Sequence, residues 1–95
     1  MNIKDLLPHT KAVSTEVLLR SEHATATAIQ ILEGKQLKEH ITQVPALLIC
    51  VLGKVVFENE KGLKEILVPG DYIRIEPMIK HWVTAITNSQ LILFK

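Results

Sequence analysis

Glycine, proline and asparagine interrupt this chain at short intervals, and these interruptions restrict its fold more than any other feature. The segments between them are short and rich in Val, Ile, Leu and Thr. Many short apolar segments joined by turn residues are typical of an antiparallel sandwich or barrel. The sequence therefore predicts an all-β fold. The interruptions come at Pro8, Gly34, Pro45, Gly53, Gly62, Pro69-Gly70, Pro77 and Asn88-Ser89.

The segments predict nine strands and one short helical turn. Residues 1–8 allow a single helical turn that ends by Pro8, because the proline ring cannot continue a helix. Gly53 is expected to begin a tight hairpin turn, since glycine can adopt a positive φ. The expected strands span residues 13–19, 24–32, 46–52, 55–57, 65–68, 72–75, 81–86 and 91–94, with one more between Gly34 and about Thr42.

Length and composition exclude several classes of protein. The 95 residues make one domain, residues 1–95, and a hydrophobic content of 47% supplies one core. Eleven basic and ten acidic side chains form neither a nucleic-acid surface nor a polybasic membrane patch. Met1–Leu7 carries charges where a signal peptide is apolar, and no apolar run reaches the ~18 residues of a membrane span. We expect a cytoplasmic protein with no nucleic-acid or membrane partner.

Residues 46–52 read Ala-Leu-Leu-Ile-Cys-Val-Leu and are apolar on both faces of a strand. Such a strand is normally covered on both sides, by the core and by a second layer or subunit. Two interpretations stay open: a central strand of a small barrel, or a strand in a dimer interface. Trp82, expected to face outward, fits a subunit contact as well as packing beneath the N-terminal segment. We expect a homodimer.

Four histidines are the only unusual polar residues. No phosphate-binding loop, dinucleotide fingerprint, nucleophile elbow or zinc-protease helix accompanies them. His9 and His23 lie in expected loops and are interpreted as solvated. His40 and His81 differ, because each lies at the edge of a strand that follows a glycine-led turn. These two are the candidate functional residues.

The order and spacing of these turns and histidines resemble a small single-domain cupin of the RmlC-like type. The resemblance covers about residues 14–95 and implies an antiparallel jelly-roll barrel with two histidine motifs on neighbouring strands across its mouth. The residues that carry it are Gly34, His40, Gly53, Pro69-Gly70-Asp71 and His81.

The resemblance also implies a metal site, from which this chain departs. His40 and His81 are the two ligands that it carries over. Imidazole suits transition metals, but the expected carboxylate is missing, so a divalent transition metal is an open alternative and no cofactor is firmly predicted. The departures are Thr42 for the second histidine and Ala46 for the glutamate of the first motif, with Met78 for the glycine and Ala85 for the asparagine of the second.

Two other carboxylates lie near the motifs in sequence. Glu39 is adjacent to His40, so on a regular strand it points to the opposite face. Glu76 precedes the turn at Pro77 and is the one carboxylate that could reach inward. Neutral oxygens such as that of Thr42 hold a transition metal poorly.

Alternation along the strands predicts what lines the barrel. If His40 faces inward, Thr42 does too, and Cys50 shares the inward face of its own strand. As the only cysteine, Cys50 excludes a disulfide, and its apolar neighbours favour a small core residue over a nucleophile. The predicted ligand-binding residues of this mostly apolar cavity are His40, His81, Thr42 and Cys50.

The cavity leads to one preferred function and two alternatives. We expect a small, partly apolar molecule to bind in the barrel, with His40 and His81 orienting its polar end. The first alternative is a metal-dependent cupin enzyme of oxygenase or isomerase type with an incomplete ligand set. The second is a structural or regulatory dimer module, because side chains often fill the interior of so small a barrel. Whether the protein is an enzyme stays open, and no catalytic residue is assigned.

Overall fold

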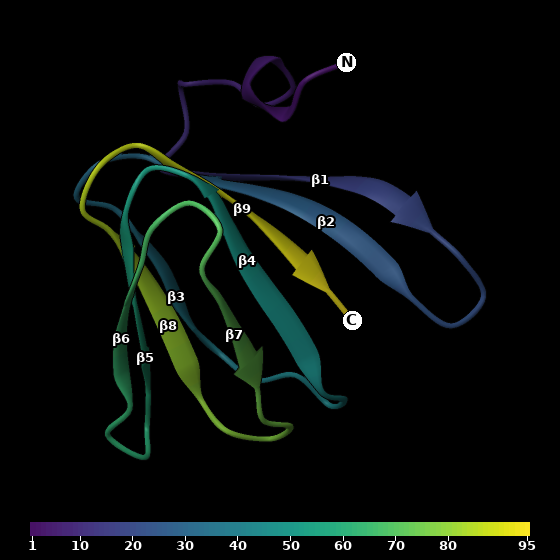
Figure 1. Ribbon diagram of the computed structural model, residues 1–95, viewed down its shortest axis with the longest axis vertical. Helices are drawn as coiled ribbons and strands as arrows, with labels where there is room; N and C mark the ends of the chain where they lie inside the picture. Colours follow the sequence, from purple (N-terminus) through teal and green to yellow (C-terminus); the bar gives the residue numbers. More distant parts are fainter.

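The computed structural model describes residues 1–95, and almost all of its regular structure is β-strand (Figure 1). A 3-10 helix, η1, spans Ile3–Asp5. Nothing helical in the chain has the length and apolar character needed to span a lipid bilayer. The strands are β1 (Val13–Arg20), β2 (Thr25–Ile31), β3 (Gln36–His40), β4 (Ala46–Leu52), β5 (Val55–Asn59), β6 (Lys64–Leu67), β7 (Tyr72–Ile75), β8 (His81–Ala85) and β9 (Ser89–Phe94).

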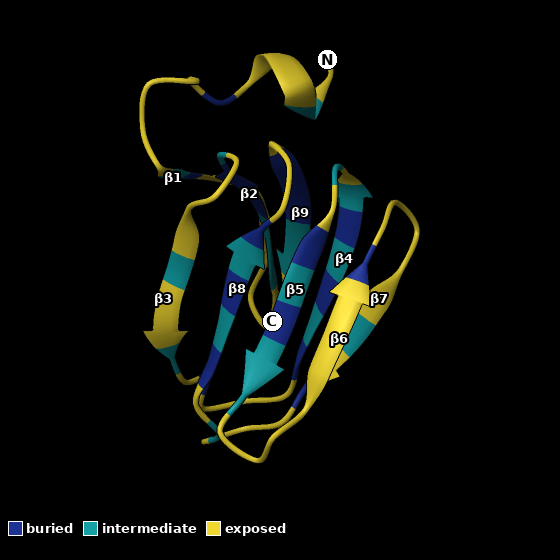
Figure 2. Cartoon of the chain, turned by 90° about the vertical axis from the view of Figure 1, so that its left-hand side faces the viewer, coloured by how far each residue is buried: buried dark blue, intermediate teal, exposed yellow.

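The strands form two antiparallel sheets that face each other. The five-stranded sheet has the order β1-β2-β9-β4-β7, and the four-stranded sheet has the order β3-β8-β5-β6. Figure 2 shows the four-stranded sheet in front of β4 and β9. When β1 is set aside, each sheet holds four strands and the chain crosses repeatedly between them, as in a jelly roll. The predicted all-β antiparallel fold is confirmed.

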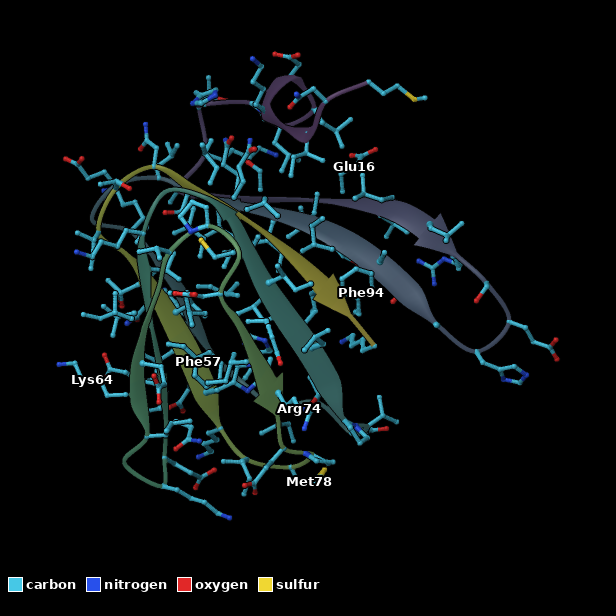
Figure 3. All side chains as sticks on the ribbon, in the orientation of Figure 1. Glu16, Phe57, Lys64, Arg74, Met78 and Phe94 are labelled. Atoms are coloured by element: carbon cyan, nitrogen blue, oxygen red, sulfur yellow. The ribbon has the colours of Figure 1, made fainter.

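The core fills the space between the sheets. Along β4 and β8 every second residue is buried, which is the period of a strand with one face inward. Phe57 of β5 is the largest fully buried side chain and lies inside the barrel (Figure 3). The core cluster consists of Ile29, Ile31, Ala46, Leu48, Cys50, Val55, Phe57, Leu67, Ile75, Val83, Ala85 and Leu91.

The N-terminal segment lies against the outer face of the five-stranded sheet at one end. The side-chain amide of Gln30 on β2 donates to the Pro8 carbonyl at 2.7 Å. The amide of Gln90 on β9 lies 3.2 Å from the Ile3 carbonyl and 3.0 Å from the side-chain oxygen of Gln30. These contacts hold η1 in place. The expected helical turn is present, and it ends at Asp5, before the proline.

Trp82 lies on the outward face of β8, as expected from its position beside His81. It is half-buried, and β8 belongs to the four-stranded sheet. The N-terminal segment packs on the other sheet, so the interpretation that it covers Trp82 is wrong.

The hairpin between β4 and β5 turns at Gly53, as the sequence predicts. Gly53 has a φ of 84°. A Cβ at this position would collide with the carbonyl oxygen of Asn88 and the hydroxyl of Ser89. That hydroxyl accepts a hydrogen bond from the Lys54 backbone amide at 2.9 Å. Both the backbone angle and the close approach of the β8–β9 turn therefore require glycine.

The replacement Gly53→Ala is expected to lower the free energy of unfolding by roughly 3 kcal/mol, because it adds a clash with backbone to the strain of a positive φ. Gly62→Ala is the matched control: its φ is 88°, but nothing lies within 4 Å of the added Cβ. The control should lose only about 1 kcal/mol. Equal losses in urea denaturation of the two variants would contradict the close-approach argument.

Candidate functional site

The two histidines that the sequence singles out meet at one end of the barrel. His40 ends β3, His81 begins β8, and the register places them opposite each other. Their Nε2 atoms lie 3.0 Å apart, and their ring centroids lie 4.2 Å apart with 61° between the planes. A β-bulge between Leu37 and His40 shifts the register of β3. Without that bulge, regular alternation from the inward Leu37 would turn Glu39 inward and His40 outward.

The ring nitrogens of the pair need more protons than two neutral imidazoles carry. The Nδ1 atom of His40 lies 3.0 Å from the Lys38 carbonyl, and the Nδ1 atom of His81 lies 3.3 Å from the Ile79 carbonyl. Each of these contacts needs an N–H, and the contact between the two Nε2 atoms needs a third. Two neutral rings supply only two. The geometry thus fits two rings that together hold one proton more than two neutral imidazoles do.

Burial makes the two rings unequal. His81 is only 2% exposed and stacks on Phe57, with ring centroids 5.5 Å apart and 21° between the planes. Burial lowers the pKa of His81, the hydrogen bond to the Ile79 carbonyl opposes this, and smaller effects of His40 and Lys95 lower the pKa further. A charge on the pair is therefore disfavoured on His81.

A small pocket of about 40 Å³ opens beside His81. That volume holds one or two water molecules and not the body of a metabolite. Half of its lining is apolar and half is polar or charged. The lining residues are Phe57, Asn59, Leu63, Arg74, Ile75, Glu76, Ile79 and His81.

Thr42 lies in the loop after β3, two residues beyond His40. It is 3% exposed, and its hydroxyl has no hydrogen-bond partner. Its carbonyl accepts a hydrogen bond from the Met78 backbone amide at 2.7 Å. Met78, at the position where the cupin motif has glycine, has a φ of 65°, so a strained residue holds the two loops of the mouth together.

The structure does not bring Cys50 to the histidine pair. His81 pairs with Asn59 at one end of β5, whereas Cys50 lies near the Gly53 turn at the other end. Cys50 is fully buried, and its thiol lies 3.7 Å from the Leu52 carbonyl. Burial raises the pKa of this thiol above its usual range. These are the properties of a core residue.

Neither candidate carboxylate joins the pair. Glu39 is exposed, and its side chain lies 3.9 Å from Lys80. Glu76 borders the pocket, but its carboxylate lies 2.9 Å from the Lys61 ammonium at the surface. The expectation that Glu39 points away from His40 is confirmed.

Sequence reasoning missed two side chains that shape the site. Phe57 supports the ring of His81, and Asn59 lies opposite His81 across β5 and β8. The inward position of Phe57 follows from its alternation with Val55, which the sequence shows. The proximity of Asn59 depends on the register between β5 and β8, which no local pattern indicates.

Comparison with known proteins supports this arrangement through structure alone. No protein-family model matches the chain, and no curated protein is significantly similar to it. A cupin superfamily protein from Desulfitobacterium hafniense DCB-2 superposes with a TM-score of 0.81 at 17% identity, over 87% of this chain and 75% of that one. The chain has the RmlC-like cupin fold.

Two further solved structures agree with this cupin assignment. An RmlC-like cupin from Shewanella frigidimarina NCIMB 400 has a TM-score of 0.81 and 18% identity, over 93% of this chain and 78% of that one. KdgF from Halomonas sp. has a TM-score of 0.82 and 20% identity, over 99% of this chain and 88% of that one. The resemblance read from the glycines and histidines is thereby confirmed at the level of the fold.

The cupin fold often binds metals, and the residues of this chain do not complete such a site. Two imidazole nitrogens converge, but a stable transition-metal site needs at least three protein ligands. No group of three or more His, Cys, Asp or Glu side chains lies together in the structure. The hydroxyl of Thr42 is neutral and does not replace a carboxylate.

Stability is expected to fall as the pH is lowered below about 6.5, the ordinary pKa of histidine in an unfolded chain. The pKa of His81 is lowered in the folded state, so the unfolded chain binds more protons and gains stability in acid. His81→Gln should flatten this dependence in urea titrations between neutral and acidic pH. His9→Gln, an exposed control, should keep it. An unchanged slope in His81→Gln would contradict the assignment.

Metal content gives an independent measurement of the same site. With only two imidazoles available, we expect protein purified without a nickel column to contain well under one transition-metal ion per chain by elemental mass spectrometry. Close to one ion per chain, lost in the His40→Ala, His81→Ala double variant, would show that the donor set is sufficient.

Proposed function

We propose that this cupin binds a small molecule at the mouth of its barrel, where His40 and His81 contact the polar end of the ligand. The observation that carries the proposal is the shortage of protons in the pair. Two buried or half-buried rings whose Nε2 atoms face each other at 3.0 Å gain from a group that donates a hydrogen bond to one of them. A hydroxyl or a protonated carboxyl on a ligand is such a group.

The unpartnered hydroxyl of Thr42 supports the same conclusion. A buried hydroxyl without a hydrogen bond costs about 1–3 kcal/mol, which a bound polar group would recover. Thr42 lies two residues beyond His40, but its hydroxyl is buried and does not line the pocket beside His81, so a ligand group would reach it only if the loop after β3 moved. A few polar atoms among apolar walls are the usual form of a small-molecule site.

The size of the pocket restricts how a ligand binds. About 40 Å³ accepts a carboxylate, a hydroxyl or a bridging water, and not the body of a larger molecule. The apolar part of the ligand would then lie across the rim, on Leu63 and Ile79. We therefore expect the polar end of the ligand to enter the pocket while its apolar part covers the mouth. The ligand would not be enclosed within the barrel.

Short-chain carboxylic acids, with the alcohols and hydrocarbons of the same chain length, are the probes that test this proposal. We expect the acids and alcohols to shift the imidazole nitrogen resonances of His40 and His81 in two-dimensional NMR, and the hydrocarbons to leave them unchanged. The His81→Gln variant should lose the shifts, while His9→Gln should retain them. Shifts that persist in His81→Gln would place binding elsewhere and refute the proposal.

A second candidate function is a structural or regulatory module whose barrel interior is filled. The observation that favours it is the packed core, which leaves no larger space between the sheets than the pocket beside His81. If no probe perturbs the histidine resonances at millimolar concentration, corresponding to a binding free energy weaker than about −4 kcal/mol, this second function replaces the first.

A further inference from the structure

We propose that residues 41–45, the loop between β3 and β4, form a lid that opens locally and gives a ligand access to the histidine pair. The lid begins directly after His40, and it contacts the loop between β7 and β8 that leads into His81. With the lid closed, the pocket beside His81 holds only about 40 Å³. The lid has a use only if a ligand binds at the mouth, so it rests on the proposed function.

A single hydrogen bond holds the lid. It runs from the Met78 backbone amide to the Thr42 carbonyl at 2.7 Å. The other backbone groups of residues 41–45 take part in no ladder between strands, because β3 ends at His40 and β4 begins at Ala46. Segments with so few hydrogen bonds open locally at a much lower free energy than the strands of a core.

The neighbouring loop, residues 76–80, is anchored more firmly. The Glu60 amide donates to the Lys80 carbonyl, and the Lys80 amide donates to the carboxylate of Glu60. The Lys61 ammonium lies 2.9 Å from the Glu76 carboxylate. Three contacts thus join this loop to the β5–β6 turn, whereas one holds the lid. We therefore infer that the lid moves and that residues 76–80 stay in place.

Thr42 makes the closed position of the lid unfavourable. Its hydroxyl is buried without a hydrogen-bond partner when the lid is closed. A buried hydroxyl in this state is worse off than one in water. Opening the lid hydrates the hydroxyl, or brings it to the polar end of a ligand beside His40. Thr42 thus favours opening and is a ligand contact of the open form.

Met78 adds a second cost at the same contact. Its φ of 65° is the only positive φ of the chain outside glycine. A residue with a side chain keeps such a backbone angle only where its surroundings impose it. The Met78 amide is itself the donor to the Thr42 carbonyl, so the strained angle belongs to the closed lid. Once this hydrogen bond breaks, Met78 can return to a negative φ.

The apolar side chains of the two loops are suited to cover a ligand. Ile41 and Val44 on the lid are exposed, and so is Met78, which Figure 3 shows at the end of the barrel. In the absence of a ligand these side chains meet water. Closed over a ligand whose polar end reaches the histidines, they would lie on its apolar part together with Leu63 and Ile79.

Hydrogen exchange of the Met78 backbone amide, measured by NMR, tests the lid. We expect this amide to exchange through a local opening that depends little on urea, because the opening exposes little surface. The Cys50 amide, which donates to the Asp71 carbonyl from the buried strand β4, is the reference. It should exchange more slowly and only through global unfolding.

Two substitutions that stabilise the closed lid provide the decisive comparison. Thr42→Val removes the unpaired hydroxyl and keeps the shape of the side chain, so it should slow exchange at Met78 roughly tenfold. Met78→Gly removes the strain of the positive φ and should slow exchange severalfold, after correction for the intrinsic rate of each sequence. Thr10→Val is the matched control: Thr10 is exposed and lies outside the mouth, and this variant should leave the rate unchanged.

The short-chain alcohols that test the proposed function separate the two proposals. If they bind and the lid closes over them, exchange at Met78 should slow in their presence. If Met78 opens locally but the alcohols change neither its rate nor the histidine resonances, the lid stands and the proposed function fails. The lid is overturned if Met78 exchanges only together with Cys50, or if neither Thr42→Val nor Met78→Gly slows its exchange.

Discussion

The contact between the inward faces of the two sheets holds the rest of the structure in place. Its twelve-residue cluster draws on strands of both sheets, from β2 to β9, so it joins segments that are distant in sequence. Burying a side chain of the size of Phe57 or Leu48 contributes about 2–3 kcal/mol. Because β4 supplies inward residues at every second position, the register of its neighbours follows from this burial. In the other sheet, the register of β3 with β8 brings His81 opposite His40 at the end of the barrel.

The dense packing of that core restricts the space for a ligand to the mouth of the barrel. Phe57 occupies the interior and stacks beneath His81, so the barrel offers a shallow mouth and not a deep cavity. The polar atoms of the site are accordingly at the rim, on strand ends and loops. Cys50, which the sequence places on the same inward face as the site, is separated from it by most of the length of β4. Residues deep within the barrel therefore belong to the core, and residues at its mouth form the site.

The sequence predicts the fold well because its signals are local. Turns at Gly53 and Pro69-Gly70, and alternation along β4 and β8, are fixed by neighbouring residues. The meeting of His40 with His81 came from the resemblance to cupins, and the structure contains it. The bulge that turns His40 inward could not be predicted, because it depends on how β3 pairs with β8. Asn59 was missed for the same reason, since only the pairing of β5 with β8 brings it to His81.

The outward side of β4 shows the remaining ambiguity. The local pattern indicates that an outward apolar residue such as Ile49 is covered. It does not distinguish a second layer of the same chain from another molecule as the cover. Only the arrangement of the whole chain shows that its two layers leave Leu47 and Ile49 without a covering strand. Of the two interpretations in the sequence, the structure shows β4 as an inner strand of its sheet, and the strand in a dimer interface stays a prediction.

Backbone hydrogen bonds join the loops around the mouth of the barrel. The Met78 amide donates to the Thr42 carbonyl, and the Glu60 amide donates to the Lys80 carbonyl. The side chains of Glu60 and Lys61 add two further bonds between the loops. Side chains on these loops that take no part in such bonds can consequently change during evolution while the backbone bonds keep the shape of the rim. Such a scaffold permits a family to diverge widely in sequence, and to acquire new ligands by substitution at the rim, without first having to remodel its fold.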